Sequence, residues 1–99
     1  MNSGETSLYI ASANGHLDVV RELLARGANI EAASNGGFTP LILASWLGHV
    51  DVVRALLAAG ANKRHVANDG TTATSCAGLD DSVKPANKAA VLALLAAAP

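Results

Sequence analysis

Histidine, cysteine and paired aspartate side chains are the groups in this chain that could do chemistry. His16 and His49 lie 33 residues apart, each between a glycine and an aliphatic residue. Because one local context recurs, a helix-start histidine that bonds the local backbone is favoured over a metal ligand or a catalytic base. His65 stands in a loop-like stretch, and we expect it to be solvated.

Cys76 and the pair Asp80-Asp81 are the remaining candidates. Cys76 falls 33 residues after Leu43, which predicts a small core residue rather than a nucleophile. A nucleophile also needs a base and an orienting group, and no such arrangement is evident. One acidic pair without further oxygen ligands at calcium-loop spacing is weak evidence for a metal. With no phosphate-binding glycine pattern and no Cys-x-x-Cys, we predict no enzyme activity, no cofactor and no metal.

A repeat organises the chain. Residues 15–29 return almost unchanged as residues 48–62, at a constant offset of 33 residues, and self-similarity at one fixed period indicates stacked repeats. Within the first copy Leu17, Val20 and Leu24, with Leu23 beside them, recur at helical spacing and predict the buried stripe of a helix. Helix pairs this short cannot bury their apolar faces alone, so they need neighbours.

Helix boundaries follow from capping and turn residues. Thr6 and Thr39 are expected N-caps, and Pro40 suits the first helical position. Gly27 and Gly60 follow the apolar stripes, where a helix end needs a residue that accepts positive φ. Turn signals at Asn35-Gly36-Gly37 and Asn68-Asp69-Gly70 predict extended, hairpin-like loops between the units.

The pattern resembles the ankyrin-repeat family. It is carried in the second unit by Gly37, Thr39-Pro40-Leu41, Ala44, Gly48-His49, Val53, Leu56-Leu57 and Gly60-Ala61, and in the first by Gly4, Thr6, Leu8, Ala11, Gly15-His16, Val20, Leu23-Leu24 and Gly27-Ala28. The resemblance implies an all-α ankyrin-repeat solenoid, with antiparallel helix pairs joined by hairpin-like loops. The family's Thr-Pro-Leu-His becomes Thr6-Ser7-Leu8-Tyr9 and Thr39-Pro40-Leu41-Ile42, so we expect some polar bonding between repeats to be lost.

We expect a single domain over residues 1–99, with repeats at about 1–33, 34–66 and 67–99. The third repeat is degenerate: Leu94-Leu95 matches Leu56-Leu57 at an offset of 38, so five residues are inserted within 78–88. A helix is expected to begin near Ser82 or Lys84. Leu92 stands where the earlier units have arginine, which predicts an apolar outer surface and weak self-association through the C-terminal repeat.

Composition limits the classes of partner. The net charge is −1, with 7 basic and 8 acidic residues, and apolar residues make up 51% of the chain. This balance shows no electrostatic footprint for nucleic acid or an anionic membrane. The single cysteine excludes an intramolecular disulfide framework. With no signal pattern or membrane-length apolar run, we expect an intracellular, cytoplasmic protein.

The resemblance also implies where a partner would bind, because the loop tips and the first helix of each repeat line the family's concave face. The matching candidates are Asn14, Asn35, Phe38, Trp46, Leu47, Asn68, Asp69, Thr71, Leu79 and Asp80, with Glu5 and Ala13 in the first unit. Phe38 and Trp46 either anchor a partner or pack on neighbouring hairpins and shield a thin core. Both interpretations stay open at this point.

The function that follows is a protein–protein interaction module that binds an unidentified protein through its concave face, without catalysis. The alternative is a structural fragment of a longer array, whose apolar end surfaces normally meet other repeats and self-associate in isolation.

Overall fold

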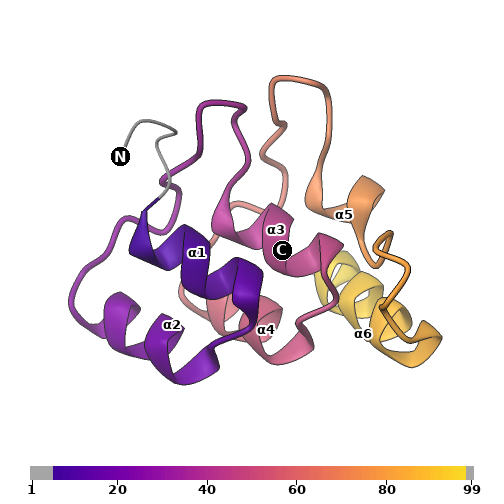
Figure 1. Cartoon of the computed structure of the whole chain (residues 1–99), viewed down its shortest axis with the longest axis horizontal. Helices are drawn as coiled ribbons and strands as arrows, with labels where there is room; N and C mark the ends of the chain where they lie inside the picture. The colour runs from indigo at the N-terminus through magenta and orange to yellow at the C-terminus, as the bar shows by residue number, and fades with distance from the viewer. Residues whose placement is uncertain (1–5, 98–99) are drawn as a thin grey trace.

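The computed structural model describes residues 6–97; Gly4 and Glu5, which the sequence assigned to the first repeat, lie outside this range. The described residues form helices and no strand: α1 (Ser7–Asn14), α2 (Leu17–Ala25), α3 (Pro40–Trp46), α4 (Val50–Ala58), α5 (Ala73–Cys76) and α6 (Pro85–Ala96). Helices α1, α3 and α5 form one row, α2, α4 and α6 form a second, and the loops between units project to one side (Figure 1). The all-α prediction is confirmed.

Each helix of the first row begins at a threonine cap. The hydroxyl oxygens of Thr6, Thr39 and Thr72 accept hydrogen bonds from backbone N–H groups three residues later, at 3.2, 3.3 and 3.1 Å. Such a cap satisfies one of the N–H groups that a helix start leaves without a partner. At the other end of the pairs, Gly27 and Gly60 have φ values of +84° and +96°. The predicted caps at Thr6 and Thr39 and the predicted positive φ at both glycines are confirmed.

The core lies between the two rows and is centred on the second unit. Leu56 and Val53 of α4 are fully buried, and every residue of α3 from Pro40 to Ser45 is buried because α3 contacts α1, α4 and α5. In α2, by contrast, only Val20 of the predicted stripe is buried. Leu23 and Leu24 are half-buried, because α2 has a neighbouring helix of its row on one side alone.

The two conserved-spacing histidines, His16 and His49, differ in their contacts. His49 Nε2 donates to the carbonyl oxygen of Ala13, 2.9 Å away in the preceding unit, whereas His16 makes no side-chain cap bond. The prediction of local bonding at both positions is therefore wrong. The imidazole lies so close to Gly15 that a Cβ there would sit 2.7 Å from His49 Nδ1. His49 thus supplies a polar bond between units from a position outside the altered Thr-Pro-Leu-His motif.

We expect His49→Ala to lower the free energy of unfolding by about 0.5–1.5 kcal/mol, because it leaves the Ala13 carbonyl without its donor. His16→Ala is the matched control and should change stability by less than about 0.5 kcal/mol, since His16 is exposed. Urea unfolding followed by circular dichroism measures both values. Equal losses in the two variants would contradict the inter-unit role of His49.

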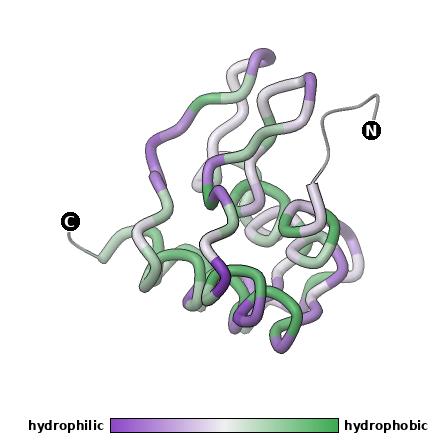
Figure 2. The backbone as a smooth tube through the Cα atoms, turned by 90° about the vertical axis from the view of Figure 1, so that its left-hand side faces the viewer, coloured by the Kyte–Doolittle hydropathy of each residue, from purple (hydrophilic) through white to green (hydrophobic). Residues whose placement is uncertain are grey.

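The loops that follow α2 and α4 stack on each other. Each closes as a hairpin-like turn, through Ser34 N–H to Phe38 O at 3.0 Å and Ala67 N–H to Thr71 O at 2.8 Å. Between the loops, His65 Nε2 donates to Gly37 O at 2.9 Å. The prediction that His65 is merely solvated is therefore wrong, because its partner lies in a loop distant in sequence. Figure 2 shows the loops rising away from the helices, so that loops and first-row helices meet at an angle.

The inserted residues of the third unit cover the end of α3. Gly78 N–H donates to Ser45 O at 2.9 Å, and Asp80 N–H approaches Trp46 O at 3.4 Å. Trp46 O is the counterpart of Ala13 O, so a backbone N–H of the insertion takes the place that the His49 side chain has between the first two units. Helix α6 begins after Lys84, as predicted.

The outer face of α6 differs from the prediction. Leu92 is half-buried and packs against the core, because the insertion changes how α6 lies against α4 and α5. The exposed stripe consists of alanines instead: Ala86, Ala89, Ala93 and Ala96. With 12 residues, α6 is the longest described helix, and no described helix is both long and apolar enough to cross a bilayer.

Candidate protein-binding surface

A shallow hollow of about 250 Å³ lies where α3 meets α5 and the second loop. We call it the Trp46 hollow; it is lined by Phe38, Ile42, Trp46, Asp69, Thr71, Cys76 and Leu79. Trp46 is 42% exposed and Leu79 is 58% exposed, whereas Phe38 is half-buried and packs against the core. Phe38 therefore shields the core, while much of the Trp46 ring faces solvent.

Five of the ten predicted site residues line this hollow: Phe38, Trp46, Asp69, Thr71 and Leu79. The other five lie outside its lining. Of these, Leu47 is half-buried behind the end of α3, and Asn14 is exposed at the end of α1. Asn68 Nδ2 donates to Asn35 O at 3.1 Å, so these two residues join the tips of the stacked loops.

Asp80 follows Leu79 in the inserted loop, and Asp69 lies in the second loop. The Asp69 carboxylate accepts the Thr71 N–H at 2.9 Å, and that of Asp80 accepts the Ser82 N–H at 3.1 Å. Hydrogen bonds from the side chain and backbone of Thr71 hold the pKa of Asp69 below its usual value. Ser82 lowers the pKa of Asp80 in the same way. Both carboxylates therefore stay ionised at neutral pH.

Sequence reasoning missed two lining residues, Ile42 and Cys76, because it assigned them to the core. A signal was available for Ile42, which precedes Trp46 by four residues and so shares its helix face. Cys76 is a core residue as predicted, 6% exposed, and it forms part of the floor. Its Sγ lies 3.5 Å from the carbonyl oxygen of Ile42.

Burial raises the pKa of the Cys76 thiol to about 11 from its model-compound value of 9.0. The reactive thiolate is therefore scarce near neutral pH. At about pH 8 we expect Ellman's reagent to label native Cys76 at least roughly 100-fold more slowly than the urea-unfolded chain, since each pKa unit is a factor of ten in thiolate. Equal labelling rates would contradict the buried placement.

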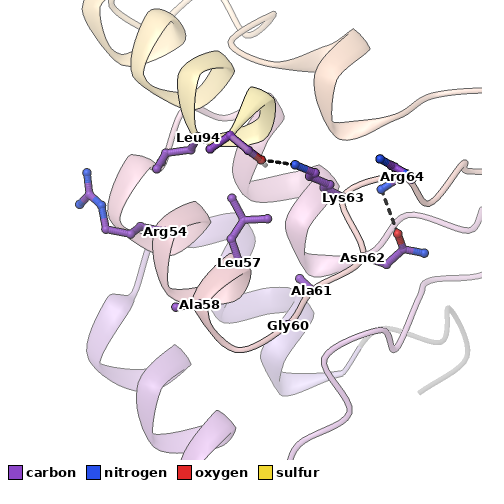
Figure 3. A pocket seen from close by; sticks show the side chains of 10 residues that line it. Arg54, Leu57, Ala58, Gly60, Ala61, Asn62, Lys63, Arg64 and Leu94 are labelled. Atoms are coloured by element: carbon purple, nitrogen blue, oxygen red, sulfur yellow. Dashed lines mark hydrogen bonds between the residues drawn. The ribbon is translucent and has the colours of Figure 1, made fainter. Parts of the chain in front are cut away.

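A second hollow, of about 600 Å³, lies between α4 and α6. Leu57 and Leu94 point into the space between the helices, with Arg54, Lys63 and Arg64 around it (Figure 3). Lys63 Nζ donates to the carbonyl oxygen of Ala97. An open hollow of similar volume, about 610 Å³, separates α2 from α4. The larger hollows are thus seams that recur between adjacent second-row helices.

No group of three or more His, Cys, Asp or Glu side chains comes together as a metal site within residues 6–97. The arrangement of the Trp46 hollow suits recognition instead, because it combines exposed apolar side chains with ionised groups at its edge.

Comparison with family models decides the family. A model described as ankyrin repeats (3 copies) matches residues 1–67. The chain belongs to the ankyrin-repeat family. The stacked helix pairs are thus an ankyrin solenoid, as predicted, and ankyrin repeats generally mediate protein–protein interaction and are typically non-catalytic. No curated protein matches the chain. The third ankyrin unit lies beyond the matched residues, in keeping with its short α5 and inserted loop.

Proposed function

We propose that this ankyrin domain binds a protein partner through the concave face, formed by α1, α3, α5 and the loop tips, and that it has no catalytic role. The observation that carries the proposal is Trp46, whose ring is 42% exposed in the middle unit. Tryptophan is enriched among the few residues that dominate binding energy in protein interfaces. Leu79 adds apolar surface beside it, and both side chains line the same hollow.

The size of the domain supports an interface built on few anchors. A standard interface buries about 800 Å² per partner, which is roughly one-seventh of the 5386 Å² accessible surface of this chain. The longest dimension is 33 Å, so a partner of ordinary size would cover most of one face. Under these conditions affinity depends on the central side chains, with Asn14, Asn35, Leu47 and Asn68 as surrounding contacts.

Trp46 is the only tryptophan, so its fluorescence tests this proposal directly. In the free protein, emission should be quenched by acrylamide. Peptides selected against the domain from a random phage-displayed library should shift that emission and protect it from quenching. Selected peptides that bind yet leave Trp46 fully quenchable would place the binding surface elsewhere and contradict the proposal.

End-to-end self-association is a second candidate, favoured by side chains at the outer side of the first unit. Val19 is 48% exposed, whereas Val52, its equivalent in the second unit, is 1% exposed. Ile10 is likewise 40% exposed, and its equivalent Leu43 only 8%. The first unit thus leaves in solvent side chains whose counterparts are buried between units. We propose that the C-terminal repeat of a second copy can cover them weakly.

Val19→Lys should reduce this association, because a charge would have to be buried at the contact. Light scattering over a range of protein concentrations is expected to show an average mass that rises with concentration for the unmodified chain and less for the variant. A concentration-independent monomer mass for the unmodified chain would remove this candidate.

A further inference from the structure

Positive charge is absent from one face of the domain. The seven basic residues, Arg21, Arg26, Arg54, Lys63, Arg64, Lys84 and Lys88, all lie in the second-row helices or in the segments that lead to them. Residues 6–14, 34–47 and 67–81 contain α1, α3, α5 and the loop tips, and no lysine or arginine occurs in these ranges. The face that carries the Trp46 hollow thus has no cation of its own in these segments.

The same face carries negative charge beside its apolar surface. Asp69 lines the Trp46 hollow, and Asp80 adjoins Leu79, which lines it from the inserted loop. Each carboxylate is held by hydrogen bonds from its own loop. The ion pairs of the described residues, Arg26–Glu22 and Arg54–Asp51, lie on α2 and α4 and involve neither group. Both charges therefore remain uncompensated by a basic side chain.

From this juxtaposition we propose that the Trp46 hollow binds a segment of a partner protein in which a large apolar side chain is flanked by lysine or arginine. The apolar side chain would lie against Trp46, Phe38 and Leu79, and the flanking cations would meet Asp69 and Asp80. A cation placed over the exposed indole ring would gain a further attraction. This inference rests on the proposed function and adds the chemistry of the partner.

A second copy of the chain is a weaker occupant, even though it offers cations. In the α4–α6 hollow, Leu57 and Leu94 are surrounded by Arg54, Lys63 and Arg64 (Figure 3). Two of these cations already have partners, because Arg54 pairs with Asp51 and Lys63 donates to the Ala97 carbonyl. A separate segment with free lysine or arginine side chains complements the hollow better.

Three synthetic peptides of about ten residues test the proposal. The first has a central Leu-Phe pair flanked by two arginines on each side, the second replaces the arginines with glutamates, and the third replaces Leu-Phe with Gly-Gly. Binding is followed through Trp46 emission and by calorimetry at about 50 mM and about 300 mM salt. We expect the first peptide to bind at least about tenfold more tightly than the second, with affinity that falls as salt rises, and the third to leave Trp46 emission unchanged.

Charge removal at the hollow provides the matched comparison. The double substitution Asp69→Asn and Asp80→Asn keeps the hydrogen-bond acceptors of both loops and should weaken the first peptide roughly fivefold, the effect expected of exposed ion pairs. Asp18→Asn removes a charge from an exposed site on α2 and should leave its affinity unchanged. Equal weakening by both changes would overturn the proposal.

The outcomes separate this inference from the proposed function. Equal binding of the arginine and glutamate peptides, or library-selected peptides that protect Trp46 but lack basic residues, would overturn the charge preference and leave the concave-face function standing. Absence of any Trp46 response to the three peptides would also overturn it. Protection of Trp46 that grows with the concentration of the protein alone would assign the hollow to a second copy and overturn the proposal.

Discussion

Leu56→Ala is expected to lower the free energy of unfolding by about 2–5 kcal/mol, the range for a leucine replaced in a packed core. Leu56 is fully buried in α4, and this helix contacts α2, α3 and α6. The cavity would therefore weaken the packing of all three units at once. Since small domains have about 5–15 kcal/mol of stability in total, the variant could lose a large part of its folded population.

Urea unfolding measures this loss, and Leu79→Ala is the matched control. Leu79 is 58% exposed, so the same chemical change there should cost less than about 0.5 kcal/mol. A urea midpoint unchanged by Leu56→Ala would contradict the placement of Leu56 at the centre of the core.

Trp46→Ala should weaken the binding of a concave-face ligand by about 2 kcal/mol or more, which corresponds to roughly a 30-fold loss of affinity. The indole ring is the largest exposed apolar group of the Trp46 hollow, and no other side chain of the lining can replace its contact area. The fold should survive, because the ring is 42% exposed and α3 is held by its buried residues Leu41 to Ser45.

Calorimetry with library-selected peptides measures this effect, and circular dichroism checks the fold. Val66→Ala is the control, since Val66 is 55% exposed outside the lining of the hollow and should bind as the unmodified chain does. Equal affinities of Trp46→Ala and the unmodified chain would show that Trp46 is not an anchor.

The elements and their order could be derived from the sequence because each depends on residues within a few positions of one another. Thr6 and Thr39 cap helices through N–H groups three residues later, and Gly27 and Gly60 end pairs through their own backbone conformation. Such contacts recur wherever the local pattern recurs, so the 33-residue period was enough to predict stacked helix pairs and the ankyrin family.

Tertiary structure decided how equivalent residues differ. His16 and His49 share one local pattern, yet only His49 has a preceding unit whose Ala13 carbonyl it can reach. Leu23 and Leu56 are likewise equivalent, but Leu56 is fully buried and Leu23 only half-buried. The reason is that burial in a stacked array depends on how many neighbours a unit has, which the pattern within one unit does not contain.

The binding surface also depended on contacts between units. The sequence pointed to Trp46, Phe38 and Asp69 through their repeat positions, but their meeting with Leu79 required the path of the inserted loop. That path is set by Gly78 N–H bonding to Ser45 O, a contact between units. Local sequence thus determined which helices form and where they end, whereas the stacking of the units determined which side chains are buried, which remain exposed and which share the hollow.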